Sequence, residues 1–183
     1  MPKKPWEELP QVWKTESAFW TYCKGVIRKG WNFHPIKLEY IKRNRVMIPN
    51  PNPKGSKKEV WGGKCEICGN TFKAGDMHVD HKSDETAKLV KQEDIQSCFE
   101  KLMLVVFDDL RWICKGCHLT HSVAQKQGMT FDGAKEYQKE IAFKKLSAQK
   151  QKETLLKYYE QSTIGKVESK RVEQYREAIK NAV

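Results

Sequence analysis

Apolar residues in the N-terminal part of the chain recur every three or four positions, and this spacing predicts helices. The first helix begins at Thr15 or Ser17, either of which can act as its N-cap, and runs to about Lys29. A second, shorter helix follows Pro35. Ahead of both, residues 1–14 are rich in proline and tryptophan and predict an irregular arm.

The middle of the chain carries shorter apolar runs. Residues 77–81 have a strand-like pattern, and residues 110–113 form a second run of this kind. Between them, residues 94–102 place apolar side chains at helical spacing, whereas residues 104–107 fit either an extension of that helix or a buried run. A helix over residues 116–125 is expected after the second strand.

Helical periodicity returns in the C-terminal part of the chain. Beyond Gly128 a long polar helical stretch is anchored by Tyr137 and Ile141 and is interrupted at residues 162–165. A last helix carries an apolar stripe at three- and four-residue steps, formed by Val172, Tyr175, Ile179 and Val183. We interpret these residues as packing stripes, with the lysines and arginines either solvated or in contact with phosphates.

A proline-rich stretch at residues 49–58 has the composition of a linker. We therefore place a boundary near residues 49–60. The chain is then divided into a basic N-terminal region (1–60), a central core (61–128) and a helical, basic C-terminal extension (129–183).

The net charge of +11 is unevenly distributed over the 183 residues. Residues 1–60 hold 13 Lys and Arg against 5 Asp and Glu, and residues 132–183 hold 12 against 8, whereas residues 61–131 hold 9 against 10. Two basic flanks around a nearly neutral centre suit a polyanionic partner, with cations held in the centre. The alternative is that the lysine-rich flanks are only solvated surface.

The composition, with 39% hydrophobic and 31% charged residues, is typical of a soluble globular protein. No apolar run approaches membrane-spanning length, and the N-terminal residues lack the apolar segment of a signal peptide. We therefore expect a cytoplasmic protein with no membrane partner.

Four of the six cysteines form two Cys-x-x-Cys pairs, Cys65/Cys68 and Cys114/Cys117. A two-residue spacer lets both thiolates of a pair face one ion, so the double pair predicts a tetrahedral zinc site. The 45 residues between the pairs exceed the usual gap of a zinc ribbon, which indicates that a further element is built between them. Cys23 and Cys98 stand alone and are expected to be buried thiols.

Three residues near the cysteine pairs have side chains suited to phosphodiester hydrolysis. Asp80 offers a hard oxygen ligand for Mg²⁺ or Mn²⁺, and His118 could complete a two-ligand site from the facing helix. His81 lies next to Asp80 but on the opposite face of a strand, where it could take a proton from an attacking water. A metal ion together with a general base is a constellation that hydrolyses phosphodiesters.

These elements together resemble the motif of the HNH nucleases. The family's Cys-x-x-Cys knuckle, Asp-His pair, Asn-Leu pair and final Cys-x-x-Cys-His are read here as Cys65/Cys68, Asp80-His81, Asp109-Leu110 and Cys114/Cys117-His118. The resemblance covers roughly a third of the chain. It implies an α+β fold with a small zinc-stapled ββα-metal, treble-clef-like core and mainly helical extensions. It also implies that His81 is the general base, that Asp80 and His118 bind the catalytic metal, and that the four cysteines bind structural zinc.

One position departs from the family pattern, because Asp109 stands where the family has Asn. The family's Asn accepts a hydrogen bond from the imidazole of the base. A carboxylate can accept the same bond and would raise the pKa of His81 by favouring the imidazolium. We expect Asp109 to orient His81; the alternatives are that Asp109 or Asp108 enters the metal shell, or that the site is weakened.

The other polar candidates are expected to contact DNA or to support the fold. The predicted DNA contacts are Lys82, Arg111, Lys115, Lys24, Arg28, Lys29, Lys42 and Arg43. His78 is expected to be a strand-face side chain, and His34 structural or exposed. His121 lies one helical turn after His118 and fits a third ligand, a phosphate contact or plain surface.

The sequence therefore predicts a metal-dependent HNH-type endonuclease that nicks or cleaves double-stranded DNA, as a monomer or homodimer. The segment ending at residues 106–110 resembles free-standing and intron-borne phage enzymes, which favours a phage or mobile-element, homing-type role over a restriction or packaging role. A non-catalytic zinc module that binds nucleic acid is the first rival. A zinc-stapled protein-interaction module is the second, although it leaves the basic flanks unexplained.

Overall fold

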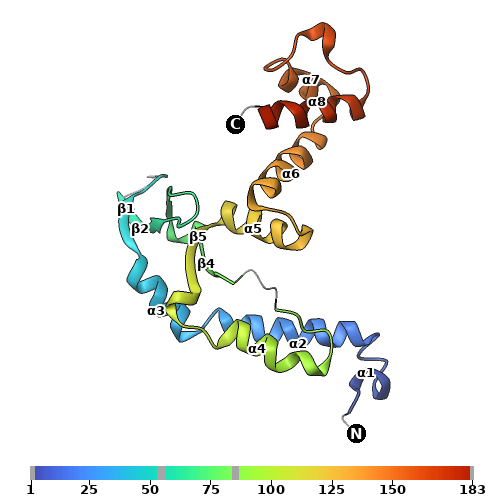
Figure 1. The fold of residues 1–183 in the computed structure, drawn as a ribbon. Helices are drawn as coiled ribbons and strands as arrows, with labels where there is room; N and C mark the ends of the chain where they lie inside the picture. Colours follow the sequence, from blue (N-terminus) through green and yellow to red (C-terminus); the bar gives the residue numbers. More distant parts are fainter. Residues whose placement is uncertain (1–2, 53–56, 84–86, 182–183) are drawn as a thin grey trace. The chain divides into compact units, whose positions relative to one another are not determined.

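The protein, described by a computed structural model over residues 3–52, 57–83 and 87–181, forms two compact units (Figure 1). They comprise Met1–His118 and Leu119–Val183. This division differs from the three-part division expected from composition, because it falls within a helix and not near residues 49–60.

The fold is mixed α/β, with many helices and two small antiparallel sheets. The helices are α1 (Pro5–Glu8), α2 (Glu16–Trp31), α3 (Pro35–Asn44), α4 (Ile95–Met103), α5 (Lys115–Gln127), α6 (Phe131–Lys144), α7 (Ala148–Leu155) and α8 (Glu168–Asn181). The strands are β1 (Val46–Pro49), β2 (Glu59–Lys64), β3 (Thr71–Lys73), β4 (Met77–His81) and β5 (Leu110–Cys114).

The N-terminal helices form a small apolar cluster with α4. Thr15 caps α2, since its hydroxyl accepts the Ala18 N–H at 3.1 Å. Residues 1–14 are not irregular throughout, because the short helix α1 brings Trp6 to 5.3 Å from the ring of Phe19. The buried members of the cluster are Trp20, Ala87, Leu89 and Cys98. Cys98 is therefore a buried thiol, as the sequence predicts.

The stretch expected to be a linker lies between two paired strands. Strands β1 and β2 pair antiparallel, with Met47 opposite Trp61 and Pro49 opposite Glu59. The Asn50 N–H donates to the Lys58 carbonyl at 2.8 Å beyond the last strand pair. Residues 53–56 of the predicted linker lie outside the described residues. The strands on either side of this stretch pair within one unit, so the stretch is not a linker between domains.

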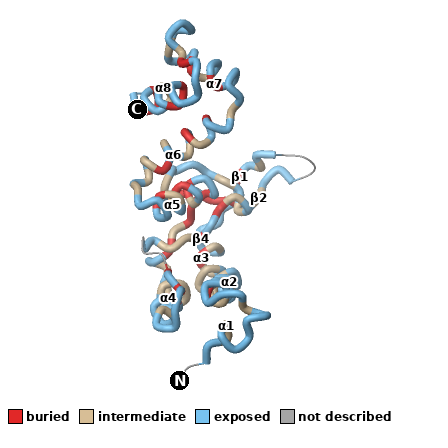
Figure 2. Tube along the Cα trace, turned by 90° about the vertical axis from the view of Figure 1, so that its right-hand side faces the viewer, coloured by how far each residue is buried: buried red, intermediate tan, exposed pale blue. Residues whose placement is uncertain are grey.

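The second sheet leads directly into α5. Strands β4 and β5 pair antiparallel, with Asp80 opposite Arg111 and His81 opposite Leu110. Buried positions, red in Figure 2, occupy most of β5. The order β4–β5–α5 confirms the two strands and the helix predicted around residues 77–81, 110–113 and 116–125.

A hydrogen-bonded clamp joins α3 to this second sheet. The hydroxyl of Tyr40 lies 2.9 Å from Oε1 of Glu66 and 3.2 Å from the Leu110 carbonyl. The same carboxylate oxygen accepts the Trp112 N–H at 2.5 Å. Tyr40 and Trp112 are both buried, so the clamp fixes the N-terminal helices against the start of β5.

The C-terminal unit has a core of its own. Phe143, Leu155 and Val172 are buried together, and Tyr175 stacks on Phe143 with ring centroids 4.2 Å apart. Val183, the last member of the predicted stripe, lies outside the described residues. Among the described residues, no helix combines the length and the apolar character that crossing a membrane requires.

An ion pair between α6 and α8 predicts a pH-dependent stability for the C-terminal unit. The Glu140 carboxylate accepts N–H groups of Arg176 at 2.8 and 2.9 Å and lies 2.7 Å from Nζ of Lys144. The hydrogen bond from Arg176, followed by that from Lys144, lowers the pKa of Glu140 to about 2. Because this pKa is lowered in the folded state, the stabilisation is complete above the ordinary value near 4.5 and is lost as the pH falls towards 2.

We expect Glu140→Gln to remove this dependence and to cost about 1–3 kcal/mol of stability at neutral pH. Hydrogen exchange of peptides from α6 and α8 between pH 7 and pH 3 measures the effect. Glu136→Gln, one turn earlier on the same helix, is the matched control and should behave like the wild type. Identical pH profiles for Glu140→Gln and the wild type would contradict the assignment.

Candidate metal centre and active site

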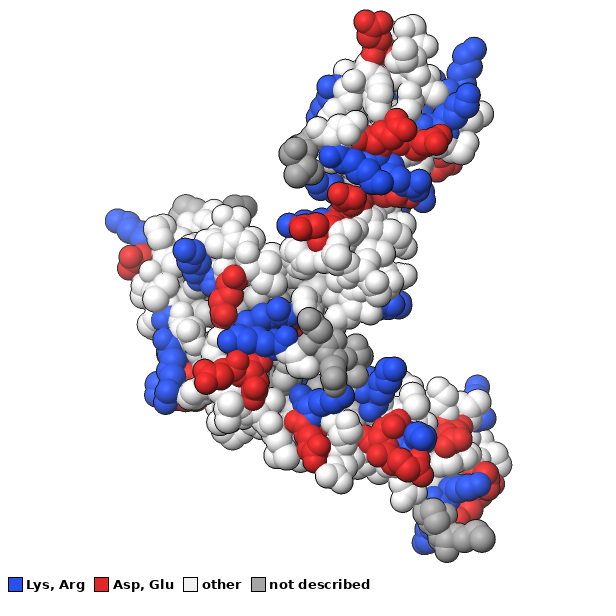
Figure 3. All heavy atoms as spheres, viewed as in Figure 1, with Lys and Arg blue, Asp and Glu red and all other residues white. Residues whose placement is uncertain are grey.

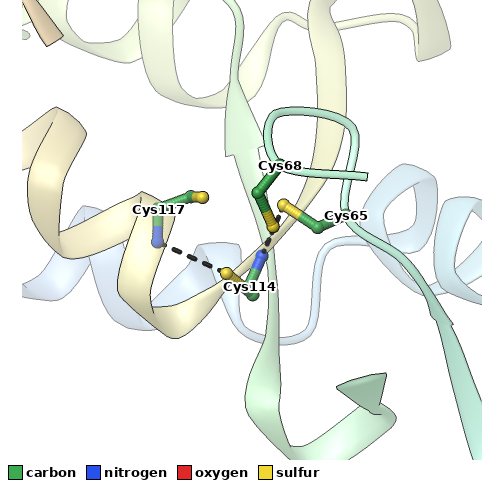
Figure 4. A group of neighbouring side chains, drawn as sticks. All are labelled: Cys65, Cys68, Cys114 and Cys117. Carbon is green, nitrogen blue, oxygen red and sulfur yellow. Dashed lines mark hydrogen bonds between the residues drawn. The ribbon is translucent and has the colours of Figure 1, made fainter. Parts of the chain in front are cut away.

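The two Cys-x-x-Cys pairs converge in the structure (Figure 4). Cys65 and Cys68 follow β2, Cys114 ends β5 and Cys117 lies in the first turn of α5. Their four sulfur atoms all lie within 4.8 Å of one another. Four thiolates about 2.3 Å from one zinc ion would be about 3.8 Å apart, so a small contraction of the cluster suffices for tetrahedral binding. The cluster could therefore hold a structural metal such as zinc.

Backbone N–H groups already point at these sulfurs. The Cys114 N–H donates to Sγ of Cys65 at 3.3 Å, and the Cys117 N–H donates to Sγ of Cys114 at 3.4 Å. Burial disfavours ionisation of the Cys65 thiol, but hydrogen bonds from backbone groups, including those of Cys68 and Cys114, outweigh it and lower its pKa to about 7. These bonds favour the thiolate form of Cys65, whereas burial and the neighbouring thiols raise the pKa of Cys117.

The first knuckle depends on a glycine at its end. Gly69 has a φ of +73°, in the left-handed region that a residue with a side chain rarely adopts. In this conformation its N–H donates to the Cys65 carbonyl at 2.9 Å. The turn reverses the chain between β2 and β3 and thereby brings Cys68 back towards Cys65.

Asp80 and His118, the predicted ligands of a catalytic ion, face each other in the structure. Nε2 of His118 lies 3.8 Å from Oδ1 of Asp80, whose side chain is 18% exposed. Two ligand bonds of about 2.1 Å would meet at about 130° across this distance, so the two atoms must approach to about 3.0 Å to give the roughly 90° angle of an octahedral ion. The exposed ring of His78 stacks on that of His118, with centroids 4.8 Å apart, which places it on the strand face as expected.

The other oxygen of Asp80 is held by Arg111. Nε and one terminal nitrogen of Arg111 donate to Oδ2 at 3.0 and 2.8 Å. The two side chains come from opposite positions of β4 and β5, which the strand register alone determines. Arg111, predicted as a phosphate contact, therefore orients the carboxylate so that Oδ1 faces His118.

His81 lies on the other face of β4, with its ring against the indole of Trp31 at a centroid distance of 4.5 Å. Nε2 is buried and has no hydrogen-bond partner among the described residues. The imidazole forms its hydrogen bond with the backbone of Leu102 instead, and since Nε2 is unpartnered this bond involves Nδ1. A ring that donates through Nδ1 carries its lone pair on Nε2 and can accept a proton there.

The surroundings of His81 shift its pKa downwards. Burial is the largest cause, and the Leu102 backbone together with the charges of Asp80 and Asp109 oppose it. Asp109 therefore acts on His81 in the expected direction, but its effect is smaller than that of burial. A neutral imidazole is the form that a general base requires.

The Asp109 carboxylate has a different hydrogen-bond partner from the one expected. Oδ2 of Asp109 accepts the Val106 N–H at 2.8 Å, and the Asp109 carbonyl accepts the Lys82 N–H at 2.7 Å. The Leu102 backbone supplies the bond that orients His81. Asp109 thus fixes the turn before β5 and acts on His81 through its charge.

The predicted DNA contacts differ in whether their side chains are already bonded within the protein. Nζ of Lys24 points inward and donates to the Ala87 carbonyl, so this lysine supports the fold. Lys42 and Arg43 are exposed but paired with Glu39. Lys115 is paired with Asp76 at 3.1 Å close to the cysteine cluster. Arg28, Lys29 and Lys82 are exposed.

Two further histidines differ in their surroundings. His34 is half-buried and lies 5.2 Å from Trp31, on the indole that also contacts His81. His121 lies one turn beyond His118, in the part of α5 that belongs to the C-terminal unit. Trp31 and the Leu102 carbonyl are the site groups that sequence reasoning missed. The position of Trp31 at the end of the first predicted helix could have suggested a role for it. A backbone carbonyl such as that of Leu102 has no signature in the sequence.

Comparisons with models of known protein families, with curated proteins and with solved structures found no match.

Proposed function

We propose that the protein is a metal-dependent DNA endonuclease of the HNH type, which hydrolyses phosphodiester bonds. One observation supports the proposal: Asp80 and His118 face each other at 3.8 Å, and the next residue along β4, His81, has an Nε2 with no partner among the described residues. A module that only binds nucleic acid does not require these three side chains together. The net charge of +11 supports a polyanionic substrate.

Asp80 and His118 would hold the ion, Mg²⁺ or Mn²⁺. When bound, such an ion offsets the charge that develops on the scissile phosphate and on the leaving oxygen. Arg111 holds Asp80 through Oδ2 and leaves Oδ1 directed at His118. Oδ1 of Asp80 on β4 and Nε2 of His118 on α5 would be two of its ligands.

His81 would act as the general base. Its Nε2 takes a proton from water as the water oxygen attacks phosphorus, and the bond from phosphorus to the leaving oxygen breaks. The Leu102 carbonyl and the charges of Asp80 and Asp109 stabilise the imidazolium that forms. Trp31 covers one face of the ring and restricts its orientation.

The four cysteines would bind zinc as a structural ion. With all four ligands supplied by protein, such a site has no open position for a substrate or a water molecule. Its role is to join the end of β2 to the start of α5, where His118 lies. Zinc therefore positions the catalytic residues and takes no part in the chemistry.

Cleavage of supercoiled plasmid and of phage genomic DNA in the presence of Mg²⁺ or Mn²⁺ tests the proposal. We expect the wild type to nick or linearise the DNA and His118→Ala to be slower by about 100-fold or more. Zinc content should be unchanged in this variant, because the cysteines are intact. Leu119→Ala, an exposed neighbour on the same helix, is the control and should cleave normally.

A nucleic-acid-binding module without catalysis is the second candidate. The observation that favours it is the bond from Arg111, which neutralises Asp80 without an ion. Salt-sensitive DNA binding by the wild type, with no cleavage of either substrate under any of these conditions, would support this function over the nuclease.

A further inference from the structure

The hairpin formed by β1 and β2 presents one exposed, partly apolar face. Met47 and Trp61 lie opposite each other in the strand register and are 47% and 48% exposed. Arg45 precedes β1 in extended backbone and shares this side of the ribbon, because side chains alternate along a strand. Its guanidinium lies over the Trp61 ring, 4.4 Å from the centroid. We call Arg45, Met47 and Trp61 the hairpin face.

The opposite side of the ribbon is packed in its middle, although Val46 on that side is exposed. Ile48 is buried there and leans over Gly62, where an added Cβ would stand 2.4 Å from Cδ1 of Ile48. Both Met47 and Trp61 are therefore exposed on one side, whereas only Ile48 of β1 is buried on the other. Tryptophan and arginine, which contact each other on this face, are among the side chains enriched at binding interfaces.

The charge of the hairpin indicates the kind of partner. Residues 45–64 contain five basic residues and one acidic residue. Among the described residues, the cations Arg45, Lys57, Lys58 and Lys64 have no carboxylate in ion-pair contact, unlike Lys42 and Arg43 on α3, which pair with Glu39. Basic side chains also spread over the part of this unit that carries β1, β2 and α3, with acidic ones among them (Figure 3). Unpaired cations beside an exposed indole suit a polyanion with stacked bases.

The hairpin is fixed to the candidate active site. Strand β2 continues directly into Cys65, and an added Cβ at Gly63 would meet the Trp112 ring at 2.3 Å, so this glycine permits close packing on β5. Trp112 is adjacent to Arg111, which holds Asp80. A molecule bound on the hairpin face is therefore held at a fixed distance from Asp80 and His81.

We propose that the hairpin face binds duplex DNA by lying in the major groove. A two-stranded antiparallel ribbon fits the width of that groove. Trp61 and Met47 would contact base edges, while Arg45, supported by the indole, would reach a phosphate or a guanine. The inference rests on the proposed function in that it names the contact that positions DNA for cleavage.

Fluorescence anisotropy with a labelled 30-base-pair duplex of random sequence tests the inference, with zinc-loaded full-length protein and no added Mg²⁺. We expect Trp61→Ala to weaken binding about 10-fold or more and Trp61→Phe to restore most of it. Arg45→Ala should lower the slope of log affinity against log salt by about 1. Tyr22→Ala removes an aromatic side chain on α2 that is 58% exposed and should bind as the wild type does. Zinc content and circular dichroism establish that each variant is folded.

The outcomes separate this inference from the proposed function. Unchanged affinity of a folded Trp61→Ala at every salt concentration would overturn the DNA contact and would be the result if the face received a protein instead. Preferential binding of a single strand over the duplex would overturn the groove geometry. Plasmid cleavage by Trp61→Ala at the wild-type rate, with normal DNA binding, would refute the inference and leave the nuclease standing. If the wild type binds DNA through Trp61 but never cleaves it, the hairpin contact stands and the nuclease function is refuted.

Discussion

His81→Ala should lower the rate of DNA cleavage about 10²- to 10⁴-fold, the usual contribution of a positioned general base. The loss follows from Nε2, the buried nitrogen that has no partner among the described residues and carries the lone pair. DNA affinity should change little, because the ring contacts Trp31 and the Leu102 backbone and not the residues of the hairpin face. Single-turnover cleavage of plasmid, with binding measured in parallel, gives both quantities.

Two further variants separate chemistry from structure. His81→Asn keeps a donor for the Leu102 carbonyl but has no basic nitrogen, so it should be as slow as the alanine variant. Added imidazole should partly restore cleavage by His81→Ala, where removal of the ring leaves space beside Trp31. Asp109→Asn should cleave normally or better, because an amide oxygen can still accept the Val106 N–H. Wild-type rates for both His81 variants would refute the assignment of the base.

Cys65→Ser should prevent zinc binding and unfold the N-terminal unit. Cys65 is 1% exposed, and its sulfur accepts a backbone N–H from the other knuckle. Structural zinc in small domains contributes about 10–16 kcal/mol, more than most domains have in net stability. All six tryptophans lie before residue 119, so tryptophan emission reports on this unit alone. Cys65→Ser should show the emission of exposed indoles and no bound zinc.

The matched control for this variant is Cys98→Ala. Cys98 is fully buried in the α2–α4 cluster, away from the metal cluster. Its replacement should cost about 1–2 kcal/mol through the cavity it leaves, and zinc should remain stoichiometric. A Cys65→Ser protein with one zinc ion and the wild-type melting temperature would disprove the structural role.

The sequence predicted the elements that depend on local pattern. The strand at residues 77–81, the helix at 94–102 and the cysteine pairs all have signals of fixed spacing, and the structure confirms them. The hairpin was missed because the proline-rich composition of residues 49–58 fits a linker and a turn equally well. Only pairing between β1 and β2, which is tertiary information, distinguishes the two.

The site residues that belong to a sequence motif could be predicted, whereas the contacts that depend on tertiary packing could not. Asp80 and His118 face each other as expected. The bond between Arg111 and Asp80 depends on strand register, which no short motif specifies. Asp109 was expected to accept a hydrogen bond from His81 because of its position in the motif. Its carboxylate instead accepts the Val106 N–H in the turn before β5.

The contacts of Trp31 and Tyr40 bear on how this chain could be modified by recombination. Each residue belongs to the N-terminal helices, yet each touches a residue that the site depends on, His81 in one case and Glu66 in the other. Grafting residues 61–128 onto a foreign targeting domain would remove both partners and leave the base without its supporting ring. Replacement of residues 1–60 by another DNA-binding domain should therefore abolish activity. The C-terminal unit has a core of its own, so a chimaera that exchanges this unit should still fold.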